Sequence, residues 1–189
     1  MRTQIFDKYK SLLNLKEMIG YGVDGDAYSL NSSDKILKIS FLYDYVFDIE
    51  RVYNNLKSNI QSVIELKPKC FVNTHSFKQL ESGYRKFLIN DTFTDQKYYI
   101  FCYEMDCCTK LTEDEKRVFH SILLNKNSFK ENYISLLNGM NDFLDFNIEN
   151  VINFVNEVQQ SPIKHIDIST CNIMKFNDEF KLIDLDRII

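Results

Sequence analysis

The chain has 189 residues, of which 44% are hydrophobic and 14% aromatic, with only 5 Gly and 2 Pro. This composition can build a substantial core as one domain or two small lobes, and it excludes disordered, collagenous and solenoid proteins. The 23 Lys and Arg residues are outnumbered by 27 Asp and Glu residues, so the net charge is -4. Because the sequence shows no cluster of basic residues, we expect no nucleic-acid partner.

The sequence also lacks the signals of a membrane or exported protein. Apolar runs such as residues 98–103 are far shorter than the roughly 20 residues of a membrane-spanning helix, and residues 1–7 have no apolar signal core. The five cysteines are an odd number and unevenly spaced, which favours free thiols in a reducing compartment over a disulfide framework. A zinc site at Cys102, Cys107 and Cys108 is a less favoured alternative. We therefore expect a soluble, cytoplasmic protein without a membrane partner.

The first part of the chain has the pattern of a sheet with one helix. Apolar residues recur at steps of three and four over residues 43–63, which predicts a helix. Turn residues separate the runs that are typical of strands. These predicted strands are residues 16–19, 27–30, 36–41, 84–90 and 98–104.

The pattern becomes helical after residue 110. Thr112 and Glu115 have the spacing of a capping box, and Pro162 ends the last helix. The predicted helices cover residues 118–124, 133–144 and 148–158, and short strands follow at residues 172–175 and 180–185. We expect an α+β fold in which residues 1–104 form an antiparallel sheet lobe. Residues 105–110 connect this lobe to a mainly helical lobe, residues 111–189.

Residues 20–25 read G-Y-G-V-D-G, a G-x-G-x-x-G pattern that two different phosphate-binding structures share. A dinucleotide-binding fold requires a helix directly after the glycines. Because residues 27–30 and 36–39 instead read as two strands, a glycine-rich hairpin folded over phosphates fits better. The alternative is that the glycines only allow a hairpin with positive φ angles.

Lys38 lies inside the apolar run of residues 36–39. A buried strand does not normally hold an ammonium without an anionic partner, so Lys38 should face a phosphate, a carboxylate, or solvent at an edge. A carboxylate of the following helix could pair with Lys38 and orient it. Glu50 is the first candidate and Asp48 the second, and the spacing does not decide between them.

Two polar motifs lie near the C-terminus, H-I-D-I-S-T-C-N at residues 165–172 and D-L-D at residues 184–186. Phosphoryl transfer needs a carboxylate that orients the attacking hydroxyl and oxygen ligands that hold magnesium. Asp167 can fill the first role, and Asn172 and Asp184 the second. Two polar-ended hairpins with Asx turns are the alternative interpretation.

In order and spacing, these motifs resemble those of the protein-kinase-like superfamily along nearly the whole chain. The glycines followed by Ala27 resemble the family's G-x-G-x-x-G-x-V, and residues 36–38 resemble its strand-three lysine motif. Residues 165–172 match H-x-D-x-x-x-x-N, and residues 184–186 stand where the family carries D-F-G.

The resemblance implies a two-lobed fold, with a five-stranded sheet and one helix above a helical lobe, that binds ATP and Mg²⁺. It implies that Lys38 contacts the α- and β-phosphates, that Asp167 is the catalytic base, and that Asn172 and Asp184 bind magnesium. It also implies that residues 104–107 form a hinge against which adenine lies, and that His165 braces the catalytic loop. The residues thereby assigned to the nucleotide are Gly20, Gly22, Gly25, Ala27, Lys38, Glu50, Glu104, Met105 and Cys107.

The sequence departs from the family in four places. It ends at Ile189, soon after the D-L-D motif, so we expect the activation segment, the A-P-E motif and the later helices to be missing. Ile166 replaces the arginine of H-R-D, and Asp186 replaces a glycine. Ser169 stands where many members carry a cation near the γ-phosphate.

We therefore expect a minimal phosphotransferase whose acceptor is a hydroxyl of a protein Ser or Thr, including its own, or of a small molecule. A partner protein could supply the missing surface. The alternative is an inactive pseudokinase that binds nucleotide or protein.

Overall fold

The computed structural model describes residues 7–22, 25–31, 33–43, 48–89, 92–125, 128–140 and 147–188. The chain forms two compact units. Unit 1 consists of Met1–Ile64 and Thr74–Cys107, and unit 2 consists of Glu65–Asn73 and Cys108–Ile189. The short segment Glu65–Asn73 therefore belongs to unit 2, although both of its sequence neighbours belong to unit 1.

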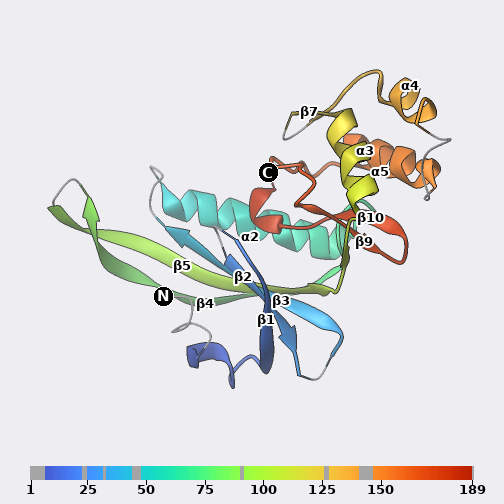
Figure 1. Cartoon of the computed structure of the whole chain (residues 1–189). Coiled ribbons are helices and arrows are strands. Elements are labelled where there is room, and N and C mark those ends of the chain that lie inside the picture. The colour runs from blue at the N-terminus through green and yellow to red at the C-terminus, as the bar shows by residue number, and fades with distance from the viewer. Residues whose placement is uncertain are drawn as a thin grey trace. The chain divides into compact units, whose positions relative to one another are not determined.

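Unit 1 contains a five-stranded antiparallel sheet and one long helix, as predicted (Figure 1). The strands lie in the order β1-β2-β3-β5-β4. Their bounds are β1 Leu15–Tyr21, β2 Gly25–Leu30, β3 Lys35–Tyr43, β4 Thr74–Ile89 and β5 Thr92–Asp106, and helix α2 is Ile49–Leu66.

The two faces of this sheet have different partners because successive side chains of a strand point to opposite faces. On one face α2 packs against β5, where Tyr53 stacks on Tyr99 with ring centroids 4.0 Å apart and lies 6.0 Å from Phe101. The opposite face carries a buried cluster that includes residues from the four strands β1, β2, β3 and β5 and from the N-terminal segment. Its members are Tyr9, Leu15, Tyr28, Leu37, Ile39, Tyr98, Ile100 and Cys102.

Unit 2 combines helices with short strands, as expected of the second part of the chain. Its core includes Phe119, Phe154 and Phe180, whose rings meet edge to face at centroid distances of 4.9–6.2 Å. The elements are β6 Thr109–Lys110, α3 Glu113–Ile122, β7 Leu123–Asn125, β8 Ser128–Phe129, α4 Tyr133–Asn138, α5 Ile148–Gln160, β9 Ile173–Phe176, β10 Glu179–Leu182 and the 3-10 helix η2 Leu185–Arg187.

The segment Glu65–Asn73 is bound to β10 of unit 2 through the backbone. Val72 N–H donates to the Leu182 carbonyl at 3.0 Å, and Leu182 N–H donates to the Cys70 carbonyl at 2.6 Å. The buried Lys181 ammonium also donates to the Lys69 carbonyl at 2.7 Å. These bonds explain why this segment is part of unit 2.

The capping box of α3 is present as predicted, with Glu115 N–H donating to Thr112 Oγ1 at 3.2 Å and Thr112 N–H donating to Glu115 Oε2 at 2.7 Å. The α5 helix and all predicted strand regions are also present, although strand ends differ.

Four predicted elements have wrong boundaries. The helix predicted over residues 43–63 begins only at Ile49, because Tyr43 still pairs with Tyr98 in the sheet. The strand predicted at residues 84–90 begins much earlier, at Thr74, where polar residues and two register shifts hide the alternation. The helix predicted over residues 118–124 ends at Ile122, and the helix predicted over residues 133–144 ends at Asn138. Residues 44–47, 90 and 141–146 lie outside the described ranges.

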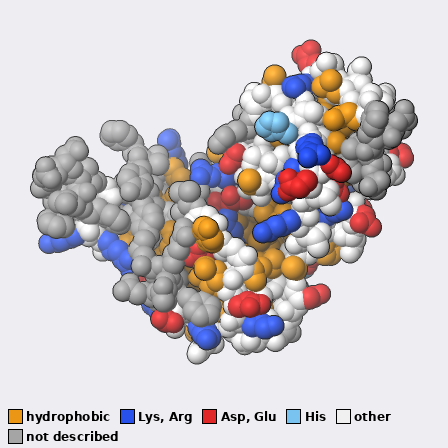
Figure 2. Space-filling view, viewed as in Figure 1, with side chains coloured by type: hydrophobic (Ala, Val, Ile, Leu, Met, Phe, Trp, Pro, Cys, Tyr) orange, Lys and Arg blue, Asp and Glu red, His pale blue; other side chains and the backbone are white. Residues whose placement is uncertain are grey.

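Among the described residues, no helix is long and apolar enough to cross a membrane. Among the described side chains on the face seen in Figure 2, Lys and Arg lie between Asp and Glu rather than in one basic patch.

Candidate functional site

The three glycines of the first motif lie in the hairpin between β1 and β2. Gly20 is in β1, Gly25 opens β2, and Gly22 N–H donates to the Gly25 carbonyl at 2.8 Å. Residues 23 and 24 lie outside the described part. The predicted strand–turn–strand context is therefore present, but none of the chain's glycines has a positive φ angle.

Gly25 is required by a close approach of backbone, not by a positive φ angle. A Cβ atom at this position would overlap the Ile39 carbonyl oxygen and lie 2.9 Å from Ser40 Cα, both on β3. A Cβ atom at Gly20 would meet the nearest atom, Ala27 Cβ, at an ordinary 3.9 Å. Ala27 itself pairs with Lys38 across β2 and β3.

Lys38 is half-buried in the middle of β3. It pairs with Ala27 on one side and with the fully buried Tyr103 on the other, and its Nζ lies 5.9 Å from the Tyr103 ring centroid. Residues directly opposite in an antiparallel pair share a face, so Lys38 lies on the face that carries Tyr99 and Tyr103. This is the face against which α2 packs.

The expected pairing of Lys38 with Glu50 or Asp48 is not what the structure shows. Glu50 lies in the exposed first turn of α2, where its carboxylate binds Lys97 of β5. The Asp48 carboxylate accepts from Arg51 N–H at 3.1 Å. The buried stripe of α2 faces the sheet, and all its members are apolar or aromatic: Ile49, Tyr53, Leu56, Ile60 and Val63.

The residues assigned to the adenine hinge have different environments. Glu104 and Met105 are in register with β3 and also with β4, so they lie within the sheet, and Met105 is buried. Cys107 follows the end of β5 and is exposed. Of the three, Cys107 is the one whose backbone lies outside the strand ladder.

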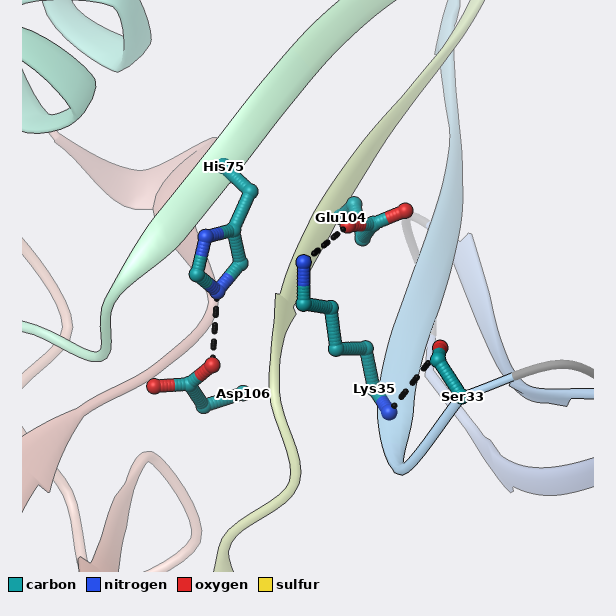
Figure 3. Close-up of polar contacts among 5 residues, drawn as sticks. All are labelled: Ser33, Lys35, His75, Glu104 and Asp106. Atoms are coloured by element: carbon teal, nitrogen blue, oxygen red, sulfur yellow. Dashed lines mark hydrogen bonds and ion pairs between the residues drawn. The ribbon is translucent and has the colours of Figure 1, made fainter.

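Side chains at this end of the sheet form a salt bridge and a histidine–carboxylate hydrogen bond that the sequence reasoning missed (Figure 3). Lys35 Nζ lies 2.9 Å from Glu104 Oε1, and His75 Nε2 lies 2.6 Å from Asp106 Oδ1. The hydrogen bond that Lys35 donates to the Glu104 carboxylate raises the pKa of Lys35. Lys35 N–H also donates to Ser33 Oγ at 3.3 Å. The Glu104 carboxylate of β5 therefore forms a salt bridge to Lys35 of β3.

His165 connects the two polar motifs of unit 2. It is 3% exposed, and its Nε2 lies 2.9 Å from the Ile183 carbonyl and 3.2 Å from the Asp184 carbonyl. Its Nδ1 accepts from Asp167 N–H at 3.1 Å. One nitrogen therefore donates and the other accepts, which defines a neutral imidazole. Burial lowers the pKa of His165 and so favours this neutral form.

Asn172 holds the other end of the same loop. Its Nδ2 donates to the Asp167 carbonyl at 2.9 Å, and its own carbonyl accepts from Ile183 N–H at 2.9 Å. Asp184 follows directly with a left-handed backbone, φ 64° and ψ 58°, a conformation that non-glycine residues rarely adopt. Asp167, Asn172 and Asp184 are thus held together by one backbone network.

The donor set fits a magnesium ion held together with phosphate. Mg²⁺ in nucleotide sites takes one or two protein oxygen ligands and completes its shell with phosphate and water. Asn172 uses its amide nitrogen for the loop, which leaves Oδ1 as the ligand atom, and Asp184 supplies a carboxylate. In the described part of the chain, no group of three or more His, Cys, Asp or Glu side chains could hold a metal without such a co-ligand.

Neither a protein-family model nor a curated protein matches the sequence. Among solved structures, the chain is similar to the ROP18 kinase domain in complex with AMP-PNP and sucrose, at 13% identity and a TM-score of 0.48, over 90% of this chain and 50% of that chain.

A second kinase domain matches at 13% identity and a TM-score of 0.46, over 93% of this chain and 50% of that chain. WbdD matches at 11% identity and a TM-score of 0.42, over 93% of this chain and 33% of that chain. The chain thus spans half or less of the length of these structures.

Proposed function

We propose that this protein is an ATP- and Mg²⁺-dependent phosphotransferase that moves the γ-phosphate of ATP to a hydroxyl. The observation that carries the proposal is the network in unit 2, where His165 and Asn172 both bind the backbone of Asp167. A loop fixed at both ends presents a carboxylate with little freedom, and such positioning supplies much of the catalysis of phosphoryl transfer.

Within this proposal, the Asp167 carboxylate accepts the hydrogen bond of the acceptor hydroxyl and orients its oxygen for attack. Asn172 Oδ1 and the Asp184 carboxylate hold Mg²⁺, which neutralises phosphate charge when bound. In unit 1 the β1–β2 hairpin, with Gly20, Gly22, Gly25 and Ala27, and the Lys38 ammonium contact phosphates. Adenine lies against the chain after β5, near Cys107.

The acceptor belongs to a protein Ser or Thr, including one of this chain, or to a small molecule. A partner protein that supplies further surface is compatible with either acceptor. The five free cysteines are consistent with a reducing, cytoplasmic location.

A thermal-shift titration with ATP, with and without Mg²⁺, followed by a labelled γ-phosphate transfer assay, tests this function. Ligand that binds only the folded chain raises its melting temperature. The informative variant is Asp184→Asn, and Asp178→Asn is its matched control, because both positions have φ 64° and Asn tolerates this conformation. We expect Asp184→Asn to lose the Mg²⁺-dependent part of the shift and the control to keep it.

Asp167→Asn separates chemistry from binding in the same assay. Because Asp167 acts on the acceptor, this variant should keep the nucleotide shift and lose about 100-fold or more in transfer rate. Equal transfer by Asp167→Asn and the native chain would remove the assigned role.

One observation favours a second candidate, a pseudokinase that binds nucleotide without efficient turnover. Glu50, the first candidate to orient Lys38, binds Lys97 instead, and the buried stripe of α2 is apolar and aromatic. Stabilisation by ATP without label transfer would select this candidate.

A further inference from the structure

Unit 2 contains a cavity of about 390 Å³ that none of the roles above uses. This volume lies within the range of about 300–1,000 Å³ that is typical of small-ligand sites. The cavity is bounded by the segment Glu65–Asn73, β8, the end of α5, the start of the 165–172 loop and β10. Its apolar walls consist of Phe71, Phe129, Val158, Ile163, Ile168 and Leu182.

Apart from Lys164, the polar groups in the walls are neutral. Burial raises the pKa of the Cys70 thiol to about 11, and His165 donates at one ring nitrogen and accepts at the other, which defines a neutral imidazole. The charges of Glu157 and Lys181, which are not in the lining, change the pKa of Cys70 in opposite directions: Glu157 raises it and Lys181 lowers it. An uncharged interior of this kind favours an apolar ligand body, because a buried charge without a partner is costly.

The edge of the cavity carries one cation. Lys164 is exposed, and its Nζ donates to the Gln159 carbonyl at 3.1 Å. This hydrogen bond positions the ammonium at the end of α5. Ile166, 40% exposed, extends the apolar lining to the surface. A ligand with an apolar body and an anionic end matches this distribution of charge.

We propose that this cavity is a regulatory site for a small carboxylate with an apolar body, of the kind of a medium-chain fatty acid, with its carboxylate beside Lys164. His165 forms part of the wall and also binds the backbone of Asp167, Ile183 and Asp184. A bound ligand therefore contacts the residue that fixes the proposed catalytic loop. The regulatory consequence rests on the proposed function, whereas ligand binding does not.

Methyl NMR of the isoleucine side chains in the full chain, without nucleotide, tests binding directly. The probe is decanoate below its micelle concentration, and decanol is the uncharged comparison. We expect decanoate to shift the methyl signals of Ile163, Ile166 and Ile168, while those of Ile39 and Ile100 in the core of unit 1 stay in place. Absence of shifts in the cavity isoleucines, or equal shifts in both groups, overturns the proposal.

Two variants locate the ligand. Lys164→Gln should weaken the binding of decanoate about threefold, the size expected of an exposed ion pair, and leave the binding of decanol unchanged. The control Lys110→Gln, at another exposed lysine, should change the affinity for neither ligand. Val158→Phe fills the cavity and should abolish binding of both. If Lys164→Gln has no effect and decanol binds as tightly as decanoate, the assignment of an anionic ligand is wrong. Because no step uses ATP, a negative transfer assay leaves this result untouched.

Discussion

At the scale of single residues, His165 connects the two polar motifs of unit 2 through its ring nitrogens. Both of its ring nitrogens bind backbone groups, one in the 165–172 loop and the other in residues 183–184. A charged imidazole has two donors and no acceptor, so protonation would break the bond from Asp167 N–H. The neutral state of this one ring is therefore a condition for the arrangement of Asp167 and Asp184.

This requirement predicts a pH dependence of stability. The pKa of His165 is lower in the folded chain than its ordinary value of 6.5, so the unfolded chain binds more protons in this range. Stability is then full above about pH 6.5 and falls as the pH decreases below that value. Urea unfolding at pH 7.0 and pH 5.5 should show this loss, and His165→Gln should be less stable but have a flatter pH profile.

His120→Gln, at a histidine outside the loop network, is the control and should keep the native pH profile. Glu81, whose pKa is lowered from 4.5 to about 2 in the folded chain, titrates below this window and does not contribute. Identical slopes in the native chain and in His165→Gln would contradict the assignment.

The exposed Glu50 gives a second prediction at this scale. Because its carboxylate binds Lys97 at the surface, Glu50→Gln should change the free energy of unfolding by less than about 1 kcal/mol and leave phosphate transfer within about twofold. Lys38→Met is the comparison and should lose transfer. A large loss of transfer in Glu50→Gln would instead support Glu50 as a partner of Lys38.

At the scale of elements, β2 approaches β3 so closely at Gly25 that this position has no room for a side chain. Gly25→Ala should destabilise the chain by about 1–3 kcal/mol, because the new methyl group overlaps backbone atoms that cannot move aside easily. Gly20→Ala is the matched control and should be tolerated, since its methyl group meets Ala27 at 3.9 Å. Urea unfolding of both variants checks this, and equal stabilities would contradict it.

The sequence predicts the central strands of the sheet better than its edge strand. The apolar alternation of residues 36–41 and 98–104 predicts β3 and β5 because both strands are central in the sheet. The edge strand β4 was largely missed, since its first half is polar and contains two register shifts. Local periodicity cannot show such interruptions.

The same limit applies to the candidate site. The 165–172 loop and Asp184 are close in sequence, so their motif could be recognised directly. The partners of Glu50 and His75 could not, because Lys97 and Asp106 lie 47 and 31 residues away. The packing of α2 on β5 brings Glu50 to Lys97, and the pairing of β4 with β5 brings His75 to Asp106.

At the scale of the whole molecule, each of the two units consists of two separate stretches of the sequence. The chain passes from one unit to the other after Ile64, after Asn73 and after Cys107. The inserted segment Glu65–Asn73 binds both backbone groups of Leu182 in β10 and provides Phe71, 2% exposed, to the core of unit 2. Unit 2 therefore depends on nine residues that precede β4.

This dependence predicts the behaviour of fragments. Residues 108–189 alone should fold poorly, because the loss of Cys70, Phe71 and Val72 removes about 1.5–3 kcal/mol for each large buried side chain and leaves the backbone of Leu182 without these partners. A second fragment, in which residues 65–73 precede residue 108 through a Gly/Ser linker, should show dispersed NMR signals and a cooperative urea transition. If both fragments unfold alike, the segment Glu65–Asn73 is not required for unit 2. If only the linked fragment folds, its stability relative to a Phe71→Ala version measures what the buried Phe71 side chain contributes to unit 2.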